Sequence, residues 1–140
     1  MNASSQGSKS SRVSDYMHRE IKTISADASL REAGQAMADN RVSALLVVRG
    51  QEYVGIISDK RLTHEGIAKG LDPETTQVQS IMRPEPIGIE GDCSVKDAQL
   101  MMKTRGVRHL VVTEEGNIVG IVSISDLIRF YSDFFDESQS

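Results

Sequence analysis

The sequence predicts a mixed α/β fold of the α+β type, in which one β-α-β-β-α unit occurs twice. Two observations support this prediction. First, the chain repeats itself without a gap at an offset of 65 positions, from Val13 with Val78 to Ser58 with Ser123. Second, both copies present strand-like, capped-helix and hairpin segments in the same order. A period of this length in only two copies indicates a duplicated domain rather than a solenoid.

Each copy begins with a short extended segment followed by a capped helix. The extended segments are residues 22–24 and 87–89. Ser29 with Glu32, and Ser94 with Asp97, have the Ser-x-x-acid spacing of a helix start. Apolar residues then recur at helical spacing, and they are Leu30, Ala33 and Met37 in the first copy and Val95, Ala98 and Met102 in the second.

A hairpin and a second helix complete each copy. The strands are expected at residues 43–48 and 53–57, and at 108–113 and 118–122, with polar turns between them. The second helices are expected to begin at Ser58 and Ser123, and the first of them to end near Gly70. The predicted division is a disordered tail 1–11, one unit 12–72, a second unit 73–132 and an acidic tail 133–140.

The composition limits the kinds of partner. A chain of 140 residues with 39% hydrophobic residues can form a core, and a net charge of -4 without a clustered basic face gives no reason to expect nucleic acid. The longest uncharged apolar run, residues 44–48, is too short to cross a bilayer, and the N-terminus lacks the apolar core of a signal peptide. With a single cysteine there is no internal disulfide. We therefore expect a cytoplasmic protein without a nucleic-acid or membrane partner.

Catalytic and metal sites are not indicated. The lone Cys93 has no histidine close to it in the sequence, and a small packed residue is the better interpretation. The histidines at positions 18, 64 and 109 lack the spacing of metal ligands. No Gly-x-x-x-x-Gly-Lys-Ser/Thr loop is present, so ATP hydrolysis of the P-loop kind is not expected. The sequence thus predicts a protein that is not an enzyme.

Three features together resemble the CBS-domain family, specifically a tandem pair of CBS domains that stands alone. They are Val-x-x-hydrophobic-Met before the first strand of each copy (Val13 to Met17 and Val78 to Met82), the run from Gly106 to Val112, and the run from Gly120 to Leu127. The resemblance covers about residues 12–132. It implies two units packed as a pseudo-twofold pair, with an adenosine-containing ligand (AMP, ADP, ATP or S-adenosylmethionine) in the cleft between them. It also implies a homodimer formed through the helices, and an effector protein on another chain.

The strongest candidate binding site lies around Ser123 and Asp126. Gly120 would let a ligand approach the backbone, the hydroxyl of Ser123 at a helix start could donate to a phosphate, and the Asp126 carboxylate could accept from two ribose hydroxyls. A simpler explanation is that Ser123 and Asp126 only cap a helix. In that case the chain could be a structural module for dimerisation or partner docking, without a ligand.

The two copies differ at the positions expected to touch a ligand. Arg61 stands where the second copy has Asp126, and because arginine has no acceptor, Ser58 and Arg61 form a weaker candidate site. By resemblance, Arg108 and His109 are a basic pair for phosphates, whereas the first copy has uncharged residues there. The resemblance also places the adenine ring against Ile87, Gly88 and Ile89. The sequence therefore predicts two unequal sites, with the ligand at the one around Asp126.

Overall fold

The structure of the chain, a computed structural model, describes residues 11–139 and the side chains of residues 11–133. The predicted disordered tail thus lies, apart from Ser11, outside the described residues. The chain forms two compact units. We call them the Arg61 unit, which contains residues 21–86, and the Asp126 unit, which contains the residues up to Glu20 together with those from Ile87 onwards.

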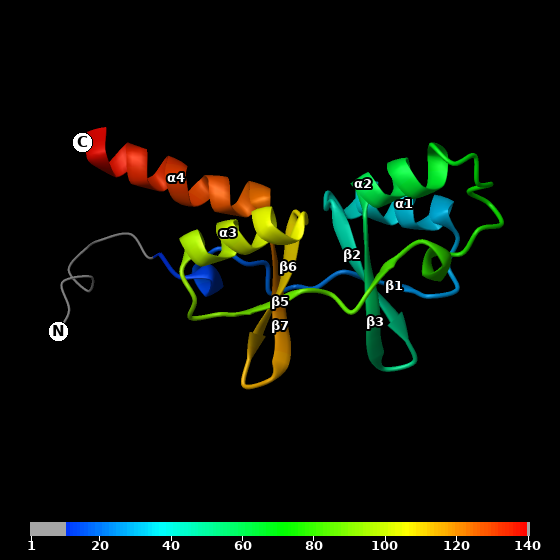
Figure 1. The fold of residues 1–140 in the computed structure, drawn as a ribbon, viewed down its shortest axis with the longest axis horizontal. Helices are drawn as coiled ribbons and strands as arrows, with labels where there is room; N and C mark the ends of the chain where they lie inside the picture. Colours follow the sequence, from blue (N-terminus) through cyan, green and yellow to red (C-terminus); the bar gives the residue numbers. More distant parts are fainter. Residues whose placement is uncertain (1–10, 140) are drawn as a thin grey trace. The chain divides into compact units, whose positions relative to one another are not determined.

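The Arg61 unit contains a four-stranded sheet in the order β1-β2-β3-β4, of which Figure 1 labels the first three strands. Strand β1 runs parallel to β2, and the other neighbours are antiparallel. Its elements are β1 (Thr23–Ser25), α1 (Leu30–Asn40), β2 (Ala44–Arg49), β3 (Glu52–Ser58), α2 (Asp59–Arg61), a π-helical turn (Leu62–Ile67), a 3-10 turn (Val78–Ser80) and β4 (Arg83–Pro84).

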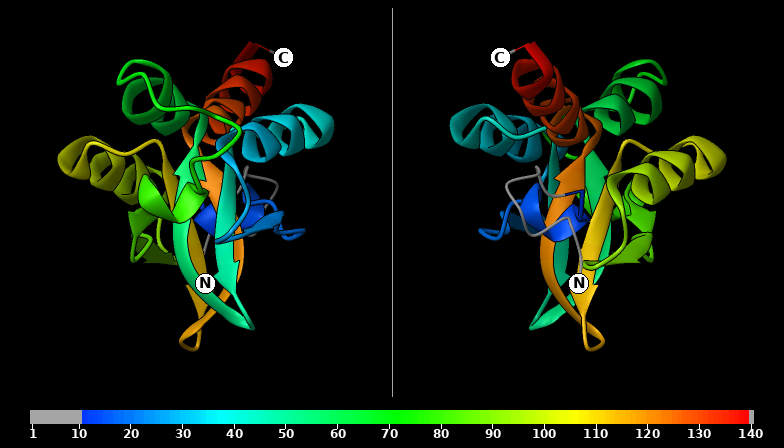
Figure 2. Two further views of the ribbon diagram at one scale, coloured as in Figure 1. Left: turned by 90° about the vertical axis from the view of Figure 1, so that its right-hand side faces the viewer. Right: turned by 90° about the vertical axis from the view of Figure 1, so that its left-hand side faces the viewer.

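The Asp126 unit repeats this plan with a three-stranded sheet in the order β5-β6-β7. Its elements are a 3-10 turn (Val13–Asp15), β5 (Gly88–Glu90), α3 (Val95–Arg105), β6 (His109–Glu114), β7 (Asn117–Ser123) and α4 (Ile124–Gln139). Strands β2 and β3 of the Arg61 unit, and β6 and β7 of the Asp126 unit, each form a long twisted hairpin (Figure 2). A single bridge between His18 and Ile121 stands where the Arg61 unit has β4.

The predicted mixed α/β class, with one structural unit repeated, is confirmed. Both expected helix starts are present, because the Ser29 and Ser94 hydroxyls accept from the backbone N–H groups of Glu32 and Asp97. Each strand of the hairpins lies within about one residue of its expected position. The largest difference is at the C-terminus, where α4 continues to Gln139 through the segment predicted as an acidic tail.

The compact units do not coincide with the ranges 12–72 and 73–132 predicted from the repeat, because the two Val-x-x-hydrophobic-Met segments are exchanged. Val13 is fully buried in the core of the Asp126 unit, and its N–H donates to the carbonyl of Cys93 at 2.9 Å. Val78 is fully buried in the core of the Arg61 unit and donates to Ala28 at 2.8 Å. Each segment therefore packs on the helix and sheet of the other copy in sequence.

Each unit encloses an aliphatic core between its helices and its sheet. In the Arg61 unit the fully buried side chains include Leu45, Val47, Ile57 and Val78, and in the Asp126 unit they include Val13, Val95, Leu110, Val112 and Val122. Among the described residues, no helix combines the length and apolar character needed to span a membrane.

Candidate functional site

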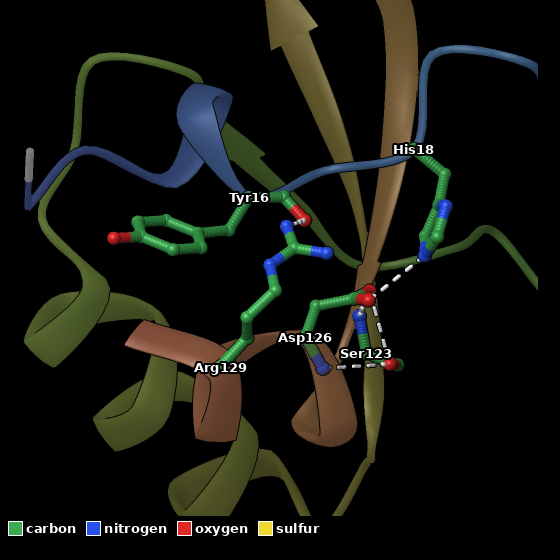
Figure 3. A network of polar contacts seen from close by, with 5 residues as sticks. All are labelled: Tyr16, His18, Ser123, Asp126 and Arg129. Carbon is green, nitrogen blue, oxygen red and sulfur yellow. Dashed lines mark hydrogen bonds and ion pairs between the residues drawn. The ribbon is translucent and has the colours of Figure 1, made fainter. Parts of the chain in front are cut away.

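Asp126 lies in the first turn of α4 and is only 7% exposed. Its Oδ2 accepts from the backbone N–H of Ser123 at 2.8 Å and from the Ser123 hydroxyl at 3.0 Å (Figure 3). In return, the Ser123 Oγ accepts from the N–H of Asp126 at 3.2 Å. The Ser-x-x-Asp pair therefore does cap the helix, and the capping fixes the orientation of the carboxylate.

His18 occupies the other oxygen of this carboxylate. Its Nε2 lies 2.8 Å from Asp126 Oδ1, and an ionised carboxylate can only accept, so Nε2 donates. The imidazole itself is 59% exposed. The sequence analysis missed this residue because it lies 108 positions from Asp126 and belongs to the exchanged N-terminal segment. No local signal connects two residues so far apart.

The chain itself fills the space beside Gly120, which was predicted to give a ligand access to the backbone. A Cβ atom at Gly120 would lie 2.5 Å from Met17 Sδ and 2.8 Å from the carbonyl oxygen of His18. The His18 N–H donates to Ile121 O at 2.8 Å, and the Ile121 N–H donates to His18 O at 3.0 Å. The glycine is thus required by the crossing of residues 17–18 over β7.

A second contact that the sequence did not reveal fixes the same N-terminal segment. Arg129 of α4 donates through Nη2 to the carbonyl of Tyr16 at 3.1 Å, and its guanidinium lies 5.3 Å from the centre of the Tyr16 ring (Figure 3). Phe130 meets that ring edge-on, with the ring centres 5.7 Å apart. Burial raises the pKa of the Tyr16 hydroxyl. These contacts hold the segment that carries His18 against α4.

The predicted basic pair lies beside Ser123. His109 is the first residue of β6, and its Cα pairs with that of Ser123 on β7. The imidazole is half-buried, and Arg108 is exposed. The carbonyl of Arg108 accepts from the N–H of Ile124 at 3.0 Å, so its backbone also contributes to the start of α4.

Residues 87–89, predicted to hold an adenine ring, form the edge of the sheet. The Ile89 side chain is 5% exposed and belongs to the core, so it is not available to line a surface slot. The carbonyl of Ile87 accepts from the N–H of Val111 at 2.9 Å. Gly88 on strand β5 is exposed. Of this predicted group, Gly88 is therefore the residue best placed for a backbone contact.

The Arg61 unit has the same framework with different side chains. The Ser58 hydroxyl accepts from the N–H of Arg61 at 3.1 Å, as Ser123 does from Asp126. Arg61 Nε donates to the carbonyl of Ile81. Arg83, which corresponds to His18 in the repeat, pairs with Ile56 across the sheet. The weaker candidate site thus contains two arginines in place of an acid and a histidine. Among the described residues, no group of three His, Cys, Asp or Glu side chains could hold a metal ion.

Comparison with known proteins identifies the family. The sequence profile of the CBS domain matches residues 13–67 and 78–133, so the chain belongs to the CBS-domain family. It is 30% identical over 117 residues to the CBS domain-containing protein YhcV of Bacillus subtilis, covering 84% of this chain and 83% of YhcV.

Two solved structures show the same fold. A putative signal-transduction protein with CBS domains from Burkholderia ambifaria is 27% identical, with a TM-score of 0.77 over 81% of this chain and 83% of that one. A hexameric CBS-CP12 protein from bloom-forming cyanobacteria is 25% identical, with a TM-score of 0.78 over 89% of this chain and 73% of that one. Pairs of CBS domains are regulatory modules, which is the class of protein to which this chain belongs.

Proposed function

We propose that this protein is a regulatory sensor that binds an adenosine-containing ligand, such as AMP, ADP, ATP or S-adenosylmethionine, at Asp126. One observation carries the proposal: a buried carboxylate is fixed at one oxygen by Ser123, while its other oxygen contacts the exposed ring of His18. In this proposal the signal passes from a cytoplasmic module to an effector protein on another chain.

The two oxygens of Asp126 have different roles in this proposal. Oδ2 accepts twice from Ser123, and these bonds keep the carboxylate plane in one orientation. Oδ1 has a partner that can leave, because the His18 ring is 59% exposed and can rotate into water. A buried carboxylate is costly without donors, so an incoming group must replace His18 with donors of its own. Adjacent ribose hydroxyls supply two O–H donors, and a carboxylate oxygen such as Oδ1 has lone pairs to accept them.

Groups beside Asp126 can bind the remainder of such a ligand. His109 lies across from Ser123, and Arg108 is the residue immediately before the strand that begins at His109. A half-buried imidazole and an exposed guanidinium suit the phosphates or the carboxylate of an adenosine-containing ligand. Gly88 at the edge of the sheet can offer backbone groups to the adenine ring.

The test is calorimetry of the purified protein with AMP, ADP, ATP and S-adenosylmethionine. At least one should bind, and Asp126→Ala should weaken it by about 100-fold, because two hydrogen bonds to a charged group are lost. Asp97→Ala is a matched control, since Asp97 has the same spacing from Ser94 at the other helix start of the unit. It should leave the affinity unchanged. His18→Ala should retain binding, since the ligand replaces that ring.

The proposal fails if the folded protein shows neither heat nor a melting shift with any of the four ligands. It also fails if Asp126→Ala and Asp97→Ala weaken binding equally, because the carboxylate of Asp126 would then act only as a helix cap.

We further propose that the protein forms homodimers through its helices, which is also the basis of the alternative function as a docking module without a ligand. Leu100 on α3 is 64% exposed and Ile128 on the neighbouring α4 is 59% exposed, an arrangement that favours association. Analytical ultracentrifugation should show a dimer that Leu100→Asp with Ile128→Asp converts to a monomer. A monomeric wild type would contradict this part of the proposal.

A further inference from the structure

The Arg61 unit carries two arginines at the positions of the Asp126–His18 pair. We propose that Arg61 and Arg83 form a binding site for a phosphate group, distinct from the ribose site proposed at Asp126. The inference does not depend on the adenosine ligand, because it rests on charges and contacts within the Arg61 unit alone.

Arg61 and Arg83 are close together because the Arg61 unit repeats the backbone of the Asp126 unit. A Cβ atom at Gly55 would lie 2.5 Å from Met82 Sδ and 2.8 Å from the carbonyl oxygen of Arg83, the same distances as at Gly120. Arg83 therefore crosses β3 as His18 crosses β7. Since His18 reaches Asp126 at 2.8 Å, side chains at the two equivalent positions, Arg83 and Arg61, start within reach of each other.

One contact directs Arg61 towards the segment that carries Arg83. Arg61 Nε donates to the carbonyl of Ile81, which is two residues before Arg83 and so at most about 7 Å from it along the chain. This bond uses one of the five N–H donors of the guanidinium and leaves both terminal nitrogens. Both arginines are half-buried, so their positions are more restricted than those of surface side chains.

The positive charge at this place has no directly paired carboxylate among the described residues. Among the described residues, neither Arg61 nor Arg83 forms an ion pair. The carboxylate of Asp59 accepts from the N–H of Lys60 at 2.7 Å, and that of Glu65 binds Lys69 at 2.6 Å. Glu65 is close enough to Arg61 for the guanidinium to help lower its pKa, although Lys69 is the main cause. An anion is the missing partner.

A phosphate group matches this arrangement better than a sugar or a carboxylate. Arginines have no acceptor, so they cannot bind ribose hydroxyls as Asp126 can. Two guanidinium groups present flat pairs of donors, and the several charged oxygens of a phosphate accept from both at once. The ligand is thus a small phosphate compound, either free inorganic phosphate or pyrophosphate, or the phosphate tail of a nucleotide.

The test is calorimetric titration of the full chain with pyrophosphate at constant ionic strength. The wild type should bind, and Arg61→Gln and Arg83→Gln should each weaken binding by about tenfold or more. Lys60→Gln is the matched control, because it removes the same charge from the adjacent exposed residue. It should change the affinity by less than about twofold. Arg108→Gln should leave pyrophosphate binding unchanged, which separates this site from the basic pair proposed to bind phosphates beside Asp126.

A second arm distinguishes the sources of the phosphate. In the Asp126→Ala background, ADP binding that is lost with Arg83→Gln identifies a nucleotide tail, whereas binding of pyrophosphate alone identifies a free anion. The inference is overturned if pyrophosphate does not bind, or if Lys60→Gln weakens binding as much as Arg83→Gln. The Arg83 side chain forms no hydrogen bond or ion pair in the described structure, so Arg83→Gln should fold normally and keep the test decisive even if Arg61→Gln is unstable.

Discussion

The Asp126 unit and the Arg61 unit have the same backbone plan but opposite charge at the equivalent place. In both, the serine at the helix start accepts from the backbone N–H three positions later. In both, a glycine is crossed by a segment that begins with methionine (residues 17–18 and 82–83), which we call the methionine segment. One unit then has a carboxylate with a histidine, and the other has two arginines. The comparison shows that the fold requires the serine and the glycine, whereas it tolerates either charge beside them.

The two units also bind an equivalent backbone carbonyl through arginines at different positions. The carbonyls of Tyr16 and Ile81 are equivalent, and each accepts from an arginine of the helix that follows the hairpin. In the Asp126 unit the donor is Arg129, whereas in the Arg61 unit it is Arg61, since the residue equivalent to Arg129 is His64. Arg61 therefore stands in the place of the acid and also supplies the arginine that donates to the carbonyl. This contact explains how a positive residue is accommodated where the other unit has a negative one.

The largest expected effect tests whether the chain crossings at Gly120 and at Gly55 are equivalent. Gly120→Ala and Gly55→Ala should each lower the free energy of unfolding by about 3 kcal/mol, at the upper end for overpacking, because a backbone carbonyl at 2.8 Å cannot move aside as a side chain can. Urea unfolding followed by circular dichroism measures both losses.

Gly34→Ala is the control for these variants. Gly34 lies in α1 with no atom within 4 Å of a Cβ, so alanine there should raise the free energy of unfolding by about 0.5–1 kcal/mol. A loss at Gly120 without one at Gly55 would show that the methionine segment of the Arg61 unit is not held as firmly as its counterpart.

An intermediate effect is expected at the two arginines that donate to the equivalent carbonyls. Arg61→Met should cost about 1 kcal/mol of unfolding free energy, and Arg129→Met about 1.5–2 kcal/mol, because Arg129 also stacks on the Tyr16 ring. Arg19→Met, at an exposed arginine of the Asp126 unit, should change stability by less than about 0.5 kcal/mol. Thermal and urea unfolding of the three variants provide the comparison. Equal losses at Arg61 and Arg19 would mean that the Ile81 contact contributes nothing.

Local signals in the sequence account for most of the elements. The helix starts at Ser29 and Ser94 follow from side chains that bond to the backbone three residues away. Both partners of such a contact lie within one short stretch of sequence, so the sequence reveals it. The length of α4 was not predictable in the same way. Gly70 adopts a φ of 73° shortly after the π-helical turn of the Arg61 unit, but no glycine or proline follows Ile124 to indicate where α4 ends.

The candidate site was only half predictable for a physical reason. Ser123 and Asp126 lie three residues apart on one helix turn, so their contact follows from spacing. His18 reaches the site on the exchanged N-terminal segment, which Arg129 of α4 holds through the carbonyl of Tyr16, and both contacts join residues more than 100 positions apart in the chain. The repeat predicted units of residues 12–72 and 73–132, whereas the burial of Val13 and Val78 places the start of each copy in the other compact unit.

The smallest expected effect concerns the caps of α1 and α3, where the units differ by one methylene group. Glu32 Oε1 accepts from the N–H of Ser29 at 2.8 Å and completes a reciprocal cap, whereas in the described structure Asp97 gives Ser94 no such bond. Asp97→Glu should therefore raise the free energy of unfolding by about 0.3–0.5 kcal/mol, and Glu32→Asp should lower it by a similar amount. Both variants keep the charge in the first helical turn, so the helix dipole does not contribute to the difference. Replicate urea titrations resolve changes of this size as shifts in the midpoint, and shifts of the same sign for the two variants would show that the reach of the side chain is not what separates the two caps.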